Sequence, residues 1–401
     1  MKKSLLALAT MGAFAGAAHA QSSVTVYGIL DVSYGQDVVD QGQVAASVKT
    51  TGLADSRNSS SRIGFRGIED LGGGMQAGFV LESGLNIANG ATFNKTNGQT
   101  ITASSGVNNT TSADSAVFGA ATRQAFVTLG TKQFGTLLVG YKKLNESDFN
   151  DSFVLGTENT LGSQGQTVSR VGRGNTISYT TPTFSGITAS VANTSQISSY
   201  DLAATETTSK INASVNQLNL SYRLDKLLVM AHGGIGTMEL GTNYTASSSS
   251  VTGLNLGVLG TGGPGTNTYN TSGIGASYDF GVARVAAMYG KRETGVKDSS
   301  QLDTTYAAFS AAIPFGKSAV KATYSMSNIK NKNNYTTAKN DGFQVVAEHN
   351  LSKRSQVWAI YGADKREAVT ASDAVAGVST TVSAANEIRS TSIRIGMTHT
   401  F

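Results

Sequence analysis

The 401-residue chain contains no cysteine, only three prolines and, after its first twenty residues, no long hydrophobic run. Without cysteine it has no disulfides, so an exported protein of this length has to be held together by hydrogen bonds and packing. No later run approaches the roughly 18 apolar residues that a membrane-spanning helix needs. The chain has 46 glycines instead. Together with the scarcity of proline, they indicate a long succession of strands and turns.

The first twenty residues have the form of a secretory signal peptide. Lys2 and Lys3 precede the apolar run Leu5–Phe14, and a small-residue cleavage motif ends at Ala20. We expect cleavage there, which leaves residues 21–401 as the mature domain. Loss of the two lysines lowers the net charge from +5 to +3. So small and dispersed a charge does not indicate a nucleic-acid partner.

The stretch Ser61–Gly67 shows the building pattern of the chain. Arg62 and Arg66 lie on one parity and Ile63 and Phe65 on the other. This period of two predicts a strand whose two faces meet different surroundings.

The same pattern repeats along the mature chain and predicts sixteen strands. They are Val24–Tyr34, Ser61–Ile68, Met75–Asn86, Thr122–Gly130, Thr136–Lys143, Arg173–Thr181, Gly186–Thr194, Ile211–Leu224, Leu227–Met238, Thr271–Phe280, Val282–Glu293, Asp303–Ile313, Ser318–Ile329, Asp341–Leu351, Ser355–Arg366 and Ile388–Phe401. Short turns and long polar loops alternate between them, and Gly35–Ser60 is the first long loop. An even number of antiparallel strands with this asymmetry is typical of a transmembrane β-barrel with short periplasmic turns and long extracellular loops.

Strands such as Val282–Tyr289 keep one apolar and one polar or small face throughout. Only 39% of the residues are hydrophobic and the mean hydropathy is −0.10, too little for the large apolar interior of a soluble barrel. Placing the polar face of such a strand against lipid costs roughly 2–4 kcal/mol for each arginine at the middle of the bilayer. We therefore expect the polar faces to line a water-filled lumen. Aromatic residues close to strand ends, including Tyr27, Tyr34 and Phe401, fit interfacial girdles.

Four segments resemble the trimeric general porins of Gram-negative outer membranes, of the betaproteobacterial type. They are Ser23–Asp31, the hairpin Ser61–Glu82, Arg123–Gly130 and the C-terminal strand that ends in Phe401. The resemblance covers essentially the whole mature chain. It implies an outer-membrane location and passive diffusion of small hydrophilic solutes and ions.

The resemblance also implies partners. It implies a homotrimer in which the loop Ile87–Ala121 latches onto a neighbouring subunit. The terminal Phe401 would be read by the barrel-assembly machinery, and lipid and lipopolysaccharide would surround the barrel. A third long loop, Leu144–Gly172, would fold back into the lumen and narrow it. A barrel of sixteen strands needs such a constriction, because its channel is otherwise too wide to select solutes.

Porins of this kind set wall arginines against carboxylates on the inserted loop. By resemblance Arg62 is a wall arginine, and its parity agrees that it points inward. Arg66 shares that face nearer the short-turn end. Glu82 matches an inward carboxylate close to these arginines.

Two further wall arginines follow from the resemblance. Arg123 matches the second, although its parity partners are apolar. Arg173 matches the third and shares parity with Ile177, so its strand would need a bulge or an irregular start; Arg170 is the alternative. At least two converging arginines predict mild anion preference.

The inserted loop offers four acids as the opposite side of the constriction, and the sequence leaves open which of them line the channel. They are Glu146, Asp148, Asp151 and Glu158.

Three other functions compete with a general diffusion channel. An outer-membrane enzyme is disfavoured because His232, His349 and His399 lie in no recognisable catalytic constellation. A channel specific for sugars or organic acids would need aromatic residues in the constriction, where only Phe149 and Phe153 are available. An adhesin remains open through loops rich in Ser and Thr. No metal-ligand spacing or phosphate-binding loop predicts a cofactor.

Overall fold

The fold is described from a computed structural model, for residues 23–40, 47–88, 122–157, 173–201, 208–240, 265–296, 300–331, 337–368 and 386–401. The predicted signal peptide, residues 89–121 of the predicted latching loop, Glu158 and Arg170 lie outside these ranges. None of the helices in the described ranges has the length and apolar character needed to cross a bilayer.

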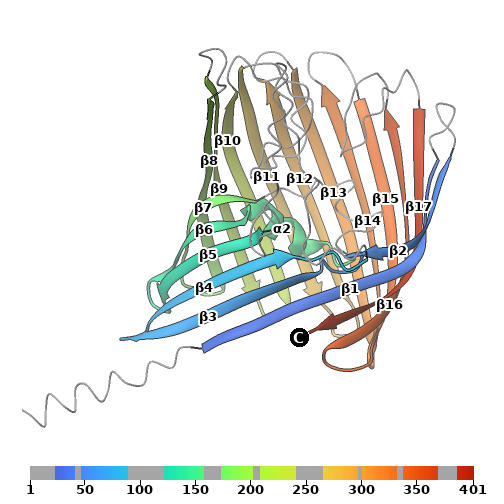
Figure 1. Ribbon diagram of the computed structural model, residues 1–401, viewed down its shortest axis with the longest axis horizontal. Coiled ribbons are helices and arrows are strands. Elements are labelled where there is room, and N and C mark those ends of the chain that lie inside the picture. Colours follow the sequence, from blue (N-terminus) through green and yellow to red (C-terminus); the bar gives the residue numbers. More distant parts are fainter. Residues whose placement is uncertain are drawn as a thin grey trace, which may run out of the picture.

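The described chain forms one closed antiparallel sheet (Figure 1). Its elements are β1 (Ser23–Asp40), β2 (Val48–Asp55), β3 (Arg62–Gly72), β4 (Met75–Gly84), β5 (Thr122–Thr131), β6 (Gly135–Lys143), α2 (Asn145–Phe153), β7 (Arg173–Thr180), β8 (Ile187–Asp201), β9 (Thr208–Leu224), β10 (Leu227–Leu240), β11 (Gly265–Asp279), β12 (Arg284–Val296), β13 (Ser300–Phe315), β14 (Ser318–Asn331), β15 (Thr337–Asn350), β16 (Ser355–Ala368) and β17 (Asn386–Thr400). Each strand pairs with the next along the chain from β3 to β17, and β17 pairs with β1. The sheet is therefore a barrel without a free edge at its closure.

The prediction of sixteen strands is confirmed with one correction. The sheet has seventeen strands, but β2 pairs with Val32–Val39 of β1 and β3 pairs with Ser23–Ile29 on the same edge. The two together occupy one position in the wall. The prediction that Gly35–Ser60 is a loop was wrong, because β1 continues to Asp40 and β2 lies within that range. Their outer faces carry polar residues such as Lys49 and Thr51, so the apolar alternation that marks a strand in lipid is missing there.

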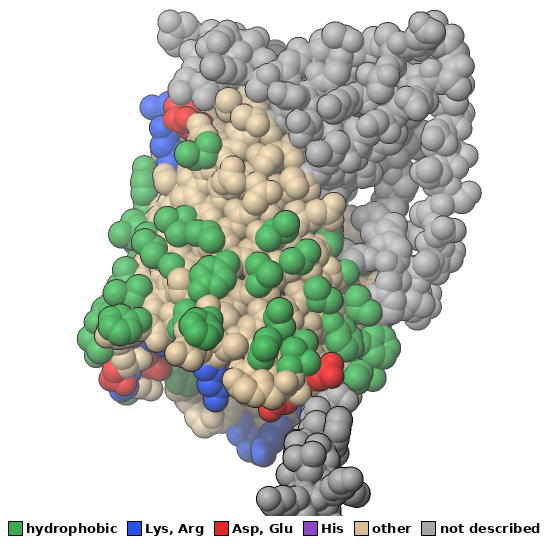
Figure 2. All heavy atoms as spheres, turned by 90° about the vertical axis from the view of Figure 1, so that its left-hand side faces the viewer, with side chains coloured by type: hydrophobic (Ala, Val, Ile, Leu, Met, Phe, Trp, Pro, Cys, Tyr) green, Lys and Arg blue, Asp and Glu red, His purple; other side chains and the backbone are tan. Residues whose placement is uncertain are grey.

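Side-chain alternation follows the expected direction, with apolar residues outside and polar residues inside. On β17, Ile393 and Ile395 are about three-fifths exposed on the outer face, while Ser392 and Arg394, which alternate with them, are buried inside. Figure 2 shows hydrophobic side chains spread over one outer face of the barrel, with charged side chains near its lower rim.

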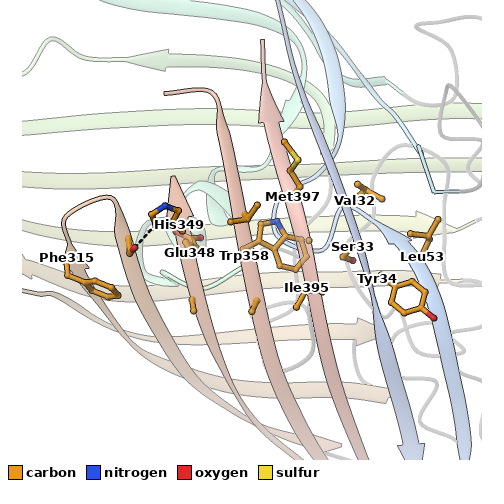
Figure 3. Close-up of a pocket in the computed structure, with 15 residues that line it drawn as sticks. Val32, Ser33, Tyr34, Leu53, Phe315, Glu348, His349, Trp358, Ile395 and Met397 are labelled. Carbon is orange, nitrogen blue, oxygen red and sulfur yellow. Dashed lines mark hydrogen bonds between the residues drawn. The ribbon is translucent and has the colours of Figure 1, made fainter. Parts of the chain in front are cut away.

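Figure 3 shows the outer wall where β13–β17 meet β1 and β2. Tyr34, Phe315 and Ile395 line an open groove of about 730 Å³ there. The side chain of Trp358 points to the opposite, inner face of the wall. It is buried and donates a hydrogen bond from Nε1 to Thr398 Oγ1 at 3.0 Å. The wall therefore separates an apolar exterior from a polar lumen.

Candidate functional site in the lumen

A cluster of charged side chains lies on the inner face of β3, β4 and β5. The Glu82 carboxylate, 3% exposed, accepts a hydrogen bond from Arg123 Nε at 2.7 Å and lies 3.9 Å from Arg62 Nη1. Tyr27 donates its hydroxyl to the second carboxylate oxygen at 3.0 Å. Arg62 also donates from Nη2 to Ser59 Oγ at 3.1 Å. Two guanidinium groups thus share this carboxylate.

A β-bulge turns Arg123 into this cluster. Glu82 lies opposite Gln124, but the next residue, Ser83, lies opposite Thr122, so Arg123 is the extra residue. A bulge bends the strand and redirects the side chain at that point. Its parity with the outward Val127 therefore does not decide where Arg123 points. The sequence could not show this, because the bulge depends on the pairing of two strands.

Tyr27 corrects the predicted aromatic girdle. Its side chain points into the lumen, where Arg66 lies over its ring with 5.3 Å between the guanidinium carbon and the ring centroid. Gly64 stands opposite Tyr27, and a Cβ on Gly64 would come within 2.5 Å of the ring, so the close approach requires glycine. The missed signal was parity: Tyr27 shares its face of β1 with the inward Asp31.

Arg173 occupies the first position of β7, opposite Lys143 of β6. It is half-buried, and its pairing with Lys143 is regular, so β7 shows neither the bulge nor the irregular start that an inward Arg173 would need. Its part in a constriction stays a prediction.

The inserted segment Leu144–Thr157 follows the inner wall, as predicted for the third long loop. Phe149 and Phe153 of α2 are fully buried and pack with Met288 and Tyr306 of the wall. Gly273 and Gly275 leave the space for these rings, since a Cβ there would come within 2.7 Å and 2.5 Å of Phe149 and Phe153.

After α2 the chain continues along the wall to β14 and β15. Gly156 donates its N–H to Thr323 Oγ1 at 3.2 Å, and Thr157 donates its N–H to Gln344 Oε1 at 2.6 Å. The segment therefore crosses the lumen along much of its inner surface.

Glu146 lies in a different place from the one expected of a pore-lining acid. It is fully buried, lies 2.6 Å from Arg292 Nη2 and accepts hydrogen bonds from the hydroxyls of Tyr306, at 3.1 Å, and Tyr269. Burial alone would raise the pKa of Glu146, but Arg292 and His232 and the hydrogen bonds outweigh it, so its pKa is lowered. Because no surface of Glu146 reaches water, its predicted position on the water path is corrected: it anchors α2 to β11–β13.

Asp148 and Asp151 lie on the more exposed side of α2. Asp148 lies 3.5 Å from Lys142 Nζ, and Asp151 lies 2.6 Å from Lys143 Nζ. These acids do reach the lumen, but lysines at the end of β6 balance their charge.

Several inward arginines were missed by the sequence analysis. Arg284 donates to the Ser152 carbonyl at 3.3 Å, in the last turn of α2, where a cation complements the helix dipole. Arg57 and Arg394 both bind Asp37, at 3.1 Å and 2.6 Å. The signal that could have found Arg284 and Arg394 is the parity of β12 and β17.

Phe401 closes the wall at its outer side. It exchanges backbone hydrogen bonds with Gly28, at 3.0 Å and 3.1 Å, and its ring lies where a Cβ on Gly28 would stand. In the described ranges no group of three or more His, Asp or Glu residues could hold a metal ion.

Comparison with known proteins agrees with this architecture. The family model described as Gram-negative porin matches residues 5–368. Outer membrane porin protein 32 of Delftia acidovorans is 29% identical over 90% of this chain and 88% of its own length. An outer membrane porin protein of Bordetella pertussis is 29% identical over 74% of this chain and 70% of its own.

Among solved structures, the anion-selective porin from Comamonas acidovorans has a TM-score of 0.64 at 23% identity, over 95% of this chain and all of that one. A trimer form of OmpT from Vibrio cholerae has a TM-score of 0.60 at 14% identity, over 95% of this chain and 99% of that one. The relatives are channels rather than enzymes. The chain belongs to the Gram-negative porin family and is an outer-membrane general diffusion channel.

Proposed function

We propose that this channel passes small hydrophilic solutes and ions with a mild preference for anions. The observation that carries the proposal is the sharing of Glu82 by Arg62 and Arg123. The two guanidinium groups bring positive charge to the wall at this level.

Among the described residues, the charged side chains of the inserted segment are paired with charges of opposite sign. Glu146 is matched by Arg292, and the exposed acids of α2 are matched by two lysines of β6. Arg66 and Arg284 add positive charge, and the contacts described for them are with a tyrosine ring, a carbonyl oxygen and a hydroxyl.

The strength of this field suits a diffusion channel. A charge about 8 Å away contributes roughly 0.5 kcal/mol in bulk water and about 2 kcal/mol at an effective dielectric of 20. Anions are thus attracted without being trapped, so they can both enter and leave. The porin from Comamonas acidovorans, which shares this architecture, is itself described as anion-selective, and that likeness supports the proposal.

The alternative, a channel specific for sugars or organic acids, gains no support from the two aromatic residues of α2. Phe149 and Phe153 are fully buried against the wall and offer no ring surface to a solute.

We also propose the assembly that the resemblance implies. The chain loses its signal peptide after Ala20, residues 21–401 form a homotrimer, and the loop Ile87–Ala121 contacts a neighbouring subunit. The barrel-assembly machinery recognises Phe401, and lipid and lipopolysaccharide surround the wall. The trimer form of OmpT, which has the same fold, supports the trimeric state.

The test of anion preference is the double variant Arg62→Gln, Arg123→Gln in planar bilayers under a potassium chloride gradient. We expect the anion-to-cation permeability ratio to fall several-fold, to about one or below, because Glu82 is then left without a cation. The matched control is Lys132→Gln, Lys226→Gln, which removes two exposed charges in short turns. An unchanged reversal potential in the arginine variant would reject the proposal.

A further inference from the structure

A second segment enters the lumen, at the interruption between β2 and β3. On one edge of β1 the pairing with β3 ends at Ile29 and the pairing with β2 begins at Val32. Only two residues of β1 therefore face the whole of Ser56–Ser61. The surplus cannot fit within the wall, so it has to leave the plane of the sheet.

Hydrogen bonds show that the segment leaves toward the inside. Asn58 donates from Nδ2 to Gln356 Oε1 at 3.1 Å, on the inner face of β16. At Ser56, where the segment leaves the wall, the backbone is left-handed (φ 60°). The hydroxyl of Ser56 accepts a hydrogen bond from the N–H of Ser61, where the segment returns to the wall, at 2.8 Å. Ser56–Ser61 thus lies over the inner faces of β1, β17 and β16, whereas Phe149 and Phe153 of α2 pack with residues of β10, β12 and β13.

One buried carboxylate holds the segment in place. Asp31 is 0% exposed, and its Oδ1 accepts the Asn58 N–H at 3.0 Å. Its other oxygen accepts the hydroxyl of Thr398, which in turn accepts Trp358 Nε1. The carboxylate of Asp31 therefore ties the segment to β17 and β16 at once.

The segment acts on the charged cluster of the lumen. Ser59 Oγ accepts a hydrogen bond from Arg62 Nη2 at 3.1 Å, and Arg57 reaches Asp37 at 3.1 Å. A guanidinium held by both Ser59 and Glu82 has fewer positions open to it than one held by the carboxylate alone.

We infer that Ser56–Ser61 is a second constriction element, which narrows the lumen opposite α2, and that Asp31 is the positioning residue that holds it and, through Ser59, Arg62. The inference rests on the proposed function only in placing Arg62 in the ion path.

The first experiment labels the segment. The chain has no cysteine, so Ser59→Cys gives one thiol in the full-length protein. After reaction with a bulky neutral maleimide, confirmed by mass, we expect single-channel conductance to fall by about half, because the adduct fills part of the pore. Ser352→Cys, in an exposed short turn, is the control and should be labelled without loss of conductance. Full labelling of Ser59→Cys at wild-type conductance would overturn the inference.

The second experiment releases the segment. Asp31→Ala should increase open-channel current noise about threefold or more, because Ser56–Ser61 loses its hold. Asp31→Asn, which keeps an oxygen acceptor for the Asn58 N–H but no charge, should stay close to wild type. Asp70→Ala, which removes an exposed turn carboxylate that also accepts a backbone N–H, should be as quiet as wild type.

An Asp31→Ala channel as quiet as wild type would contradict the positioning role, and so would equal noise in Asp31→Ala and Asp70→Ala. If Asp31→Ala does not form channels, the labelling of Ser59→Cys decides alone. Conductance and noise do not depend on the sign of ion selectivity, so a wild-type channel without anion preference would reject the proposed function and leave this inference standing.

Discussion

Glu82 and Glu146 are both carboxylates inside the barrel that bind arginine, and their surroundings differ. Glu82 is shared by Arg62 and Arg123, whose side chains are 16% and 14% exposed. Glu146 has Arg292 and two tyrosine hydroxyls around it, and neither charged side chain is more than 5% exposed.

The difference teaches that stoichiometry and burial decide what an ion pair does in a channel. Arginines that share a carboxylate and keep some exposed surface can interact with passing ions. A matched pair buried with hydroxyl donors presents no net charge, but breaking it leaves the remaining ion without water or a partner. We expect the first arrangement to select ions, whereas the second holds α2 against the inner wall.

The largest expected effect follows from removing the buried acid. Glu146→Ala leaves Arg292 buried without its carboxylate, which typically costs about 3–5 kcal/mol. We expect a clearly lower unfolding temperature of the purified barrel and a noisier open channel, since α2 loses its anchor. Asp148→Ala, on the exposed side of the same helix, is the control. Equal unfolding temperatures for the two variants would show that Glu146 is not an anchor.

Acid should reproduce that release in the unmodified chain. Because the pKa of Glu146 is lowered in the folded protein from the usual 4.5, its stabilising effect is complete above that pH and is lost as the pH falls through the lowered value. Channel noise should therefore stay constant from neutral pH down to about 5 and rise only below about 4. Glu146→Gln should lack this step. A transition centred above pH 5 would contradict the assignment to Glu146.

The exposed cluster predicts a change of selectivity rather than of stability. Glu82→Gln removes a charge that offsets Arg62 and Arg123, so the anion-to-cation permeability ratio should rise about twofold at low salt. This increase should be smaller in 1 M salt, where the Debye screening length is only about 3 Å. Reversal potentials at the two salt concentrations measure it, and a fall in the ratio would refute the shared-carboxylate arrangement.

The smallest effect belongs to the exposed pair that joins β6 to α2. Lys143 and Asp151 are 27% and 33% exposed at the side chain, and such a pair contributes about 0–1 kcal/mol. Asp151→Asn should shift the unfolding temperature very little compared with Glu146→Ala. A shift as large as that of Glu146→Ala would mean that burial does not separate the two kinds of pair.

Parity predicted a large part of the fold and a smaller part of the site. It identified every strand of the described wall except β2, which shares one wall position with β3. Strands that extend beyond the apolar band, as β2 does, lose the alternation of apolar and polar residues. Parity placed Arg62 and Glu82 on the inner face correctly. Parity would also have placed Tyr27 inside, but its aromatic character was given more weight than the face that it shares with Asp31.

Register explains the remaining differences. Arg123 points inward because a bulge against β4 breaks its parity, which no inspection of β5 alone could reveal. Glu146 is one of four acids in the inserted loop, and nothing in that stretch distinguishes it from Asp148. Its partners on β11, β12 and β13 belong to distant parts of the chain.

The sequence by itself determined a barrel with an apolar exterior and a polar lumen, because the alternation of side chains along a strand is a local property of the backbone. Only the tertiary structure decided which carboxylate meets which arginine, which of them is buried, and that Ser56–Ser61 turns inward. Those outcomes depend on the register between strands and on where the inserted segments pack. Both are set by contacts between residues that lie far apart in the sequence.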